Sequence, residues 1–354
     1  IAAQNFCRDL NSICGCRAYL TQEAQNAVFL IGILGEDAAI DALTGDTVKD
    51  LRDESGELRW ESYLIKLLKG GRVVLAGQGR RGAIFAVYEL SRLFGVSPWY
   101  FFADVPVKKS EALFLPQNFL KTDWPSVQFR GIFLNDEEEL NAWAKLPNDG
   151  TIGPETYRHV FELILRLKGN YIWPAMHVNA FNADPENGRL ADEMGIVVGT
   201  SHCDMLLRSN QHEYDPWVGK KGYQGLLYDY SIAETAAPLS YLFINSIPFA
   251  QTGAELRKAY ENGIRKIWVD NVGALKPLEQ DMEYFLAFGW DAARPEALVH
   301  RVHDYLTAWF NEQFSGKFGE ECARIYEGYA QITNVCKVEH LTRDVFSQTS
   351  YGDE

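Results

Sequence analysis

The chain has 354 residues, of which 47% are apolar and 23% are charged, so it is long enough for two or three globular domains with a buried core. A net charge of −14 argues against nucleic acid and anionic membrane surfaces as partners. No apolar run approaches the roughly 18 residues of a membrane-spanning helix. The same charge opposes an acidic polysaccharide at long range, so a protein that binds one needs a local basic pocket.

Residues 1–125 are predicted to form an N-terminal α/β accessory domain. A helix is expected at 2–13, strands at 27–32 and 72–76, and an amphipathic helix at 82–94, which Gly95 ends. The stretches 37–43 and 62–68 fit a helix or a strand equally well. The polar, proline-bearing stretch 108–125 is the best candidate for a linker.

The segment 77–82, GQGRRG, has the glycine spacing of a dinucleotide-binding turn and lies between a predicted strand and a predicted helix. Isolated matches of this kind are common. Arg80 and Arg81 stand where the backbone would have to approach a pyrophosphate, and no βαβ unit precedes the segment. We therefore expect no cofactor, and an NAD(P)-dependent oxidoreductase is kept as a distant alternative.

From residue 129 onward, strand-like runs with polar ends alternate with helix-like runs, which predicts a parallel sheet. The predicted strands are 129–134, 170–177, 195–204, 241–245 and 266–272, and the predicted helices are 155–168, 188–194, 254–262 and 278–288. We interpret residues 126–294 as a (β/α)8-type catalytic barrel, incomplete as written because a full barrel needs about 250 residues. Residues 295–354 are predicted to begin a helical domain.

Polar and aromatic side chains gather where the predicted strands end. Asp136 and Glu137 follow the first strand, Trp173 belongs to the second, and His202 and Asp204 follow the third. Carboxylates, an imidazole and an aromatic ring suit acid/base chemistry on a sugar. At any single strand end, helix capping and turn formation explain such residues about equally well, but three successive ends favour a site.

Asp136 is the first candidate for a catalytic carboxylate, and Glu137 is the alternative. The predicted substrate-binding residues could stack on a sugar ring or hold its hydroxyl and carboxylate groups, although each also has an ordinary structural explanation. They are Asn135, Trp173, His202, Asp204, Asn271 and Lys276. No metal site is expected.

A family resemblance is carried by RGIFLNDEEELNAWA, YRHVFELILRLKGNYIWPAM, LADEMGIVVGTSHCDML and IWVDNVGALKPLE, which are similar to glycoside hydrolase family 115, the xylan α-1,2-glucuronidases. Upstream, IGILGEDAAIDAL, LRWESYLIKLL and GQGRRGAIFAVYELSRLFGVSPWYFFADVP resemble the N-terminal domain of that family. The resemblance implies an inverting enzyme that removes α-1,2-linked glucuronic acid, or its 4-O-methyl ether, from xylan.

Compared with that family, the middle of the barrel is missing between Trp217 and Leu227, together with motifs that hold much of the family's catalytic machinery. His177 also stands where the family usually has Trp. A catalytically inactive carbohydrate-binding relative is therefore the second hypothesis.

The expected partners are xylan or xylo-oligosaccharides that bear glucuronic acid, with no nucleic acid and no membrane, and a homodimer is left open. We expect secretion, although a chain that starts at Ile1 says nothing about a signal peptide. The six cysteines show no zinc-site spacing. Free thiols are expected, and a disulfide from Cys7 to Cys14 or Cys16 is the alternative.

Overall fold

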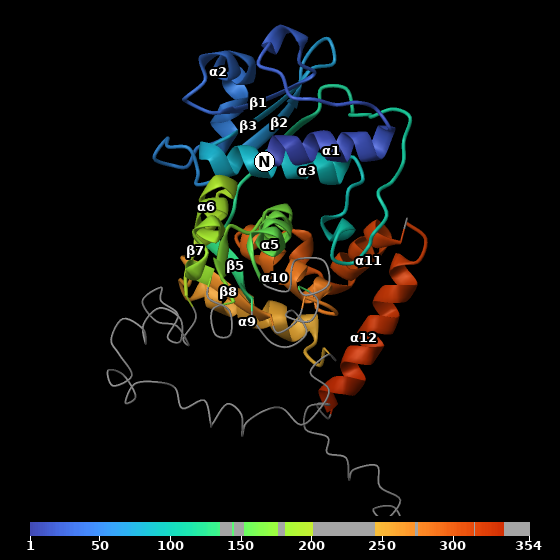
Figure 1. The fold of residues 1–354 in the computed structure, drawn as a ribbon. Helices are drawn as coiled ribbons and strands as arrows, with labels where there is room; N and C mark the ends of the chain where they lie inside the picture. Colours follow the sequence, from blue (N-terminus) through green and yellow to red (C-terminus); the bar gives the residue numbers. More distant parts are fainter. Residues whose placement is uncertain are drawn as a thin grey trace, which may run out of the picture.

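The computed structural model describes residues 1–134, 144, 152–175, 181–200, 245–272, 275–314 and 316–335. Two sheets follow one another along the chain, a mixed sheet and then a parallel sheet. In Figure 1 the mixed sheet and its helices form the upper part, the parallel sheet lies below them, and two C-terminal helices lie to one side.

The mixed sheet has the strand order β1-β3-β2-β4, in which β1 and β3 are parallel and the other two pairs are antiparallel. Its strands are β1 (Phe29–Ile33), β2 (Tyr63–Leu67), β3 (Val73–Gly77) and β4 (Leu120–Asp123). The helices of this region are α1 (Ala2–Cys14), α2 (Ala38–Thr44) and α3 (Gly79–Leu93). The predicted α/β character is confirmed, with element bounds shifted by a few residues.

Both undecided stretches form regular structure. The stretch 62–68 is strand β2, in which Tyr63, Leu64 and Ile65 are all fully buried, so the strand lacks the alternation that would have identified it. The stretch 37–43 belongs to helix α2. The Asp37 carboxylate caps this helix by accepting hydrogen bonds from the backbone N–H groups of Ala39 and Ile40 at 2.9 and 3.2 Å.

The glycines between β3 and α3 allow a close approach of strand and helix. A Cβ atom on Gly77 would lie 2.0 Å from the carbonyl carbon of Gly82, and one on Gly82 would lie 2.5 Å from the Ser62 carbonyl oxygen. Neither position has room for a side chain, so packing explains both glycines.

The parallel sheet has the strand order β7-β6-β5-β8, and every neighbouring pair is parallel. Its strands are β5 (Phe129–Leu134), β6 (Tyr171–Trp173), β7 (Val197–Val198) and β8 (Ile267–Val272). Among the described strands of this sheet, the last one, β8, pairs with the first one, β5, as barrel closure requires.

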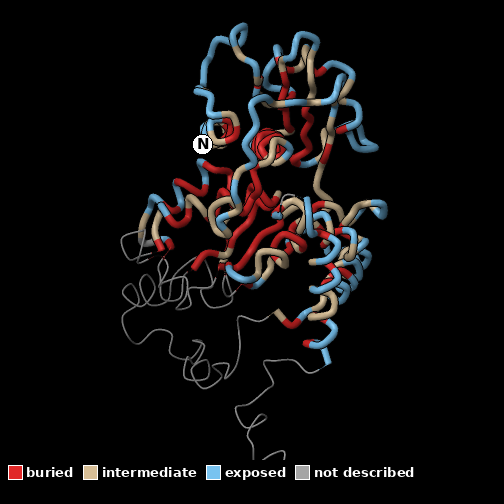
Figure 2. Tube along the Cα trace, turned by 90° about the vertical axis from the view of Figure 1, so that its right-hand side faces the viewer, coloured by how far each residue is buried: buried red, intermediate tan, exposed pale blue. Residues whose placement is uncertain are grey.

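Among the described residues, the helices that accompany the parallel sheet lie on one of its faces. They are α5 (Pro154–Arg166), α6 (Pro185–Met194), α9 (Phe249–Glu261) and α10 (Glu279–Asp291). Ile132, Leu134 and Val272 join buried residues of α5, α6 and α10 in one core, while Trp268 joins Phe249 of α9 in a second. A doubly wound sheet carries helices on both faces, so this one-sided cover fits a (β/α) barrel. Figure 2 shows the buried strands at the centre of the molecule.

Two helices end the described chain, α11 (Val302–Gln313) and α12 (Gly319–Val335), and they pack on each other. Tyr305, Leu306 and Ala323 join them to the core around α9 and α10. The helical prediction is confirmed up to residue 335, and the rest of 295–354 lies outside the described residues. The short 3-10 helices are η1 (Ala24–Asn26), η2 (Gly45–Leu51), η3 (Pro98–Tyr100), η4 (Phe181–Ala183) and η7 (Leu298–His300).

A buried ion pair joins the two sheets at the N-terminal end of the parallel strands. Glu61, just before β2, contacts the fully buried Arg130 of β5, with 3.0 Å between Oε2 and Nη2. The Asn170 amide, just before β6, donates to both carboxylate oxygens of Glu61 at 2.9 Å. Arg81 of α3 also contacts Glu61. The mixed-sheet region is therefore anchored to the start of two parallel strands.

A second buried network lies beside it around Lys168. The Lys168 Nζ lies 2.9 Å from Asp123 and 3.1 Å from Glu89. Although burial disfavours the ammonium, these two carboxylates raise the pKa of Lys168 above its usual value. Although burial also opposes ionisation of Glu89, Lys168 and Lys121 hold the pKa of that carboxyl well below its usual value. Lys168 and Glu89 are therefore both charged at neutral pH.

Candidate active site at the C-terminal end of the parallel strands

The strand register brings two predicted binding residues to the same edge. Phe133 of β5 pairs with Trp173 of β6 on one side and with Asn271 of β8 on the other. Because the strands are parallel, all three residues lie at the C-terminal end of the sheet and on its same face. This is the end at which barrel enzymes place their catalytic residues.

Several predicted site residues lie outside the described residues. Asn135, Asp136 and Glu137 directly follow β5, whose last residue is Leu134. His202 and Asp204 follow β7 and also lie outside, as does His177. Their roles in a site stay predictions.

Lys276 lies beyond β8, on the surface. Its side chain is 58% exposed, and its Nζ is 4.0 Å from the Asp104 carboxylate in the segment that follows η3. An exposed ion pair of this length contributes little to stability, about 0–1 kcal/mol. The ammonium can therefore turn to another anion at small cost.

Trp173 is half-buried and is fixed by neighbouring rings. Its indole N–H donates to the Tyr171 hydroxyl at 3.1 Å. Its ring packs edge-on against Phe133 at 5.8 Å between centroids. Both contacts lie on the face opposite the helices, which is the inner face of a barrel.

A pair of carboxyl groups that sequence reasoning missed lies at the same end. Burial raises the pKa of Asp270, in β8, to about 6 and the pKa of Asp281, in the first turn of α10, to about 7, and the two groups repel each other. The Asn245 amide donates to Asp281 at 2.6 Å. Perturbed carboxyl groups cluster at functional sites, although they lie here on the helix side of β8. No sequence signal distinguishes Asp281 from an ordinary acidic residue at a helix start.

Helix α12 reaches the same region through Asn245. The Asn245 side chain also donates to the Tyr326 hydroxyl at 2.8 Å, and the Tyr329 hydroxyl donates to the Asn245 carbonyl at 2.7 Å. The C-terminal helical segment thus contacts residues at the C-terminal end of the parallel strands.

The glycine-rich turn between β3 and α3 is occupied by contacts within the chain. The two arginines of the glycine-rich turn contact carboxylates of the chain, since Arg80 lies 3.5 Å from Asp192 and Arg81 contacts Glu61. Within the described ranges, no group of three or more His, Cys, Asp or Glu side chains could hold a metal ion. Among the helices of these ranges, none is both long and apolar enough to cross a membrane. Cys7, Cys14, Cys16 and Cys322 are free thiols.

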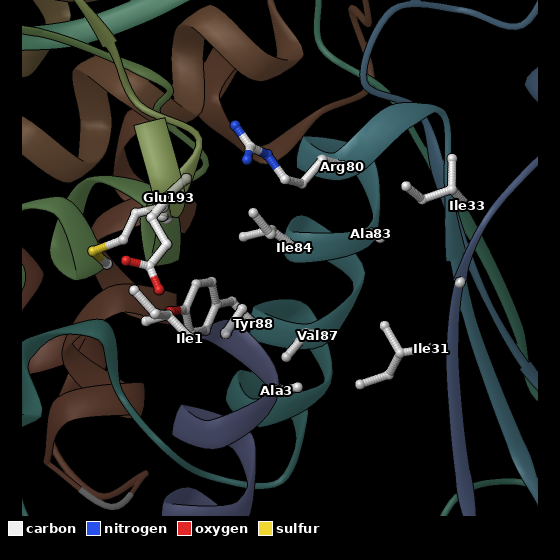
Figure 3. Close-up of a pocket in the computed structure, with 14 residues that line it drawn as sticks. Ile1, Ala3, Ile31, Ile33, Arg80, Ala83, Ile84, Val87, Tyr88 and Glu193 are labelled. Carbon is white, nitrogen blue, oxygen red and sulfur yellow. The ribbon is translucent and has the colours of Figure 1, made fainter. Parts of the chain in front are cut away.

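A cavity of about 300 Å³ lies elsewhere, among α1, α3, β1 and α6. Figure 3 shows Ile84 and Val87 of α3 between Ile31 of β1 on one side and Glu193 of α6 on the other. Its lining is mainly aliphatic, which does not suit a charged sugar. Its lining comes from the mixed-sheet region and from α5 and α6, and it contains none of the residues at the strand ends described above.

The sequence profile of glycosyl hydrolase family 115 matches residues 122–221 and 217–340. The chain belongs to this family. The two matched segments meet at 217–221, close to the stretch at which the middle of the family 115 barrel is predicted to be missing. Strands β5, β6 and β7 fall in the first segment and β8 falls in the second.

One solved family 115 structure shares the fold over 94% of this chain, with a TM-score of 0.77 and 22% identity. It is described as a 4-O-methyl-α-glucuronidase with specificity for decorated arabinogalactans, and the present chain spans 59% of its length. A chitobiase of Flavobacterium johnsoniae has a TM-score of 0.37 and 13% identity, with 92% of this chain and 46% of that chain covered. A family 20 β-N-acetylglucosaminidase has a TM-score of 0.30 and 18% identity, with 49% of this chain and 38% of that chain covered. No curated protein sequence matches the chain.

Proposed function

We propose that this family 115 protein is a secreted glycoside hydrolase that removes α-1,2-linked glucuronic acid, or its 4-O-methyl ether, from xylan. Membership of family 115 carries the proposal. The position of Trp173 and Asn271 at one edge of the sheet supports it. Strand β5 lies between these residues, and its sequence continues within two residues into the four acids at positions 136–139.

The proposed mechanism is inverting. One carboxyl group protonates the leaving oxygen while another activates a water molecule on the opposite side of the sugar, and the two groups lie about 6.5–9.5 Å apart in such enzymes. Asp136 takes one of these roles, with Glu137 as the alternative. Asn271 and Lys276 bind the uronate through charge-assisted hydrogen bonds.

The remaining predicted residues bind the sugar. Trp173 stacks on a ring, Asn135 and His202 hydrogen-bond to hydroxyl groups, and Asp204 orients His202. Lys276 supplies a local positive charge, which a chain of net charge −14 needs in order to hold an anionic sugar.

The test is incubation with glucuronoxylan and, separately, with a decorated arabinogalactan. From a chain with the family segment restored after Trp217, we expect glucuronic acid release from xylan, with the β-anomer appearing first in proton NMR, because inversion of an α-linkage gives a β-product. The 354-residue chain itself should release little or none. Release of the α-anomer would exclude inversion, and release from arabinogalactan alone would exclude xylan as the substrate.

Asp136→Asn tests the catalytic carboxylate. We expect the 354-residue chain to be poorly stable and to release little or no glucuronic acid, because the middle of the family barrel is missing from it. The variant is therefore made in a chain with the family segment restored after Trp217. Loss of one acid or base should lower the rate about 10²–10⁴-fold. The denaturation midpoint should not change. Glu139→Gln, three residues further along, is the control and should retain the wild-type rate; a wild-type rate in Asp136→Asn would remove this residue from the mechanism.

The second candidate is a catalytically inactive carbohydrate-binding protein, which the missing segment favours. It predicts that the chain binds glucuronic-acid-substituted xylo-oligosaccharides in calorimetry, and that restoring the segment gives no release. Binding of NADPH in a fluorescence titration would instead support the distant oxidoreductase alternative.

A further inference from the structure

A row of aromatic rings runs along the face of the parallel sheet opposite the described helices. Trp60, before β2, packs edge-on against Phe129 at the start of β5, with 5.8 Å between centroids. Phe129 contacts Tyr171 at 6.0 Å, and Trp173 contacts Phe133 at 5.8 Å. The row begins at the mixed-sheet region and ends at the C-terminal edge of the sheet, where Trp173 stands.

Tyr171 and Trp173 are joined by a hydrogen bond as well as by their common face. The residues are two positions apart in β6, so their side chains point the same way. The indole has a single donor, and here it points to the Tyr171 hydroxyl at 3.1 Å. This bond selects one orientation of the Trp173 ring.

Gly199, directly after β7, packs against both rings. Its backbone N–H donates to the Ile172 carbonyl at 2.9 Å, which holds it against β6. A Cβ atom at Gly199 would lie 1.9 Å from the Tyr171 hydroxyl and 2.9 Å from Cδ1 of Trp173. Any side chain there would displace one or both rings, so glycine is needed for the observed ring positions.

We propose that Tyr171 and Gly199 are positioning residues that hold the Trp173 indole as a stacking platform for a pyranose ring of a glucuronic-acid-bearing oligosaccharide. This rests on the proposed function, because it assumes that the sugar binds at this edge. Tyr171 is buried and acts only through Trp173, whereas Trp173 is half-buried and presents the ring.

The test uses Tyr171→Phe, which removes only the hydroxyl group, in the full chain. The Trp173 indole N–H signal, assigned by its absence in Trp173→Phe, should shift in the ¹H–¹⁵N spectrum. The Kd for a glucuronic-acid-substituted xylo-oligosaccharide should rise roughly three- to tenfold, the usual effect of one lost hydrogen bond. Tyr284→Phe, which removes a buried hydroxyl bonded to the Val299 carbonyl at 3.0 Å, is the matched control and should bind like the wild type.

A double-mutant cycle separates positioning from general destabilisation. In the Trp173→Phe background, Tyr171→Phe should have no further effect on the Kd, because Tyr171 acts through the indole. Equal effects in both backgrounds would overturn the inference. Gly199→Ala tests the same contact from the residue that follows β7 and should weaken binding at least as much, so the inference stays testable even if Tyr171→Phe does not fold.

The outcomes also separate the inference from the proposed function. Binding by the wild type with an unchanged Kd in Tyr171→Phe and Gly199→Ala would overturn the inference and leave the proposed function intact. Failure of the wild type to bind any glucuronic-acid-substituted oligosaccharide would overturn both.

Discussion

The charged groups at the two ends of the parallel sheet differ in whether they have partners of opposite charge. At the N-terminal end, the buried Arg130 and the partly buried Lys168 are ion-paired with carboxylates from the mixed-sheet region. At the C-terminal end, Asp270 and Asp281 are carboxyl groups whose pKa values burial raises. The ion pairs at the N-terminal end keep their charged groups partnered. At the C-terminal end, ionisation of either carboxyl group lowers the stability of the folded chain. In barrel enzymes the same division separates the stabilising face from the catalytic face.

Removing a charge at the N-terminal end should have the largest effect. Lys168→Met leaves Asp123 and Glu89 buried with one cation fewer, and breaking a buried ion pair costs about 3–5 kcal/mol. The measurement is the free energy of unfolding from urea denaturation at pH 7. Lys258→Met is the control, because Lys258 is exposed, lies 3.6 Å from Glu255 and should contribute less than about 0.5 kcal/mol. A loss below about 1 kcal/mol for Lys168→Met would contradict the stabilising role of this end.

Neutralising a carboxylate at the C-terminal end should raise the free energy of unfolding, whereas removing Lys168 at the other end lowers it. The pKa of Asp281 is raised to about 7 in the folded chain, so ionisation destabilises the fold progressively as pH rises from about 4 to above 7. Asp281→Asn should therefore stabilise the chain at pH 8 by about 1–3 kcal/mol, less than the full 1.36 kcal/mol per pKa unit because the side chain is only partly buried. The gain should vanish at pH 4. Unfolding free energies at both pH values test this, and a loss of stability at pH 8 would contradict it.

The smallest effect is expected at Asp270, whose pKa is raised to about 6. Asp270→Asn should stabilise the chain at pH 8 by about 1–2 kcal/mol, again with no gain at pH 4. Because the two carboxyl groups repel each other, the double variant should gain less than the sum of the single variants. An additive result would show that Asp270 and Asp281 do not interact.

Elements with a clear hydrophobic period could be predicted from the sequence. Strand β5 has the predicted bounds, and α5 and α10 differ from the prediction by one to three residues at each end. Helix α9 begins at Phe249, five residues before the predicted start at 254. Its first turns contain Gly253, which weakens the helical signal, yet a Cβ there would lie 2.3 Å from the Tyr284 hydroxyl. Packing against α10, which no local pattern reveals, requires this glycine.

The site could be predicted only in outline. Parallel strands with polar ends predict a common edge, and the structure places Trp173 and Asn271 there. The strand pattern did not predict the raised pKa values of Asp270 and Asp281, because these depend on burial by distant segments. Nor did it reveal the Tyr171 to Trp173 hydrogen bond, which depends on side-chain rotamers and on the glycine at position 199.

The pairing of β5 with β8 also bears on how the chain folds during synthesis. Phe129 pairs with Ile267, so the edge of β5 that pairs with β8 has no partner until residues 267–272 have been synthesised. An unpaired strand edge invites association with other chains. Glu61 is synthesised well before β8 and can hold Arg130 of β5 against the mixed-sheet region in the meantime. The buried ion pair thus suits a nascent chain, in which it would keep the first parallel strand docked until its last partner arrives.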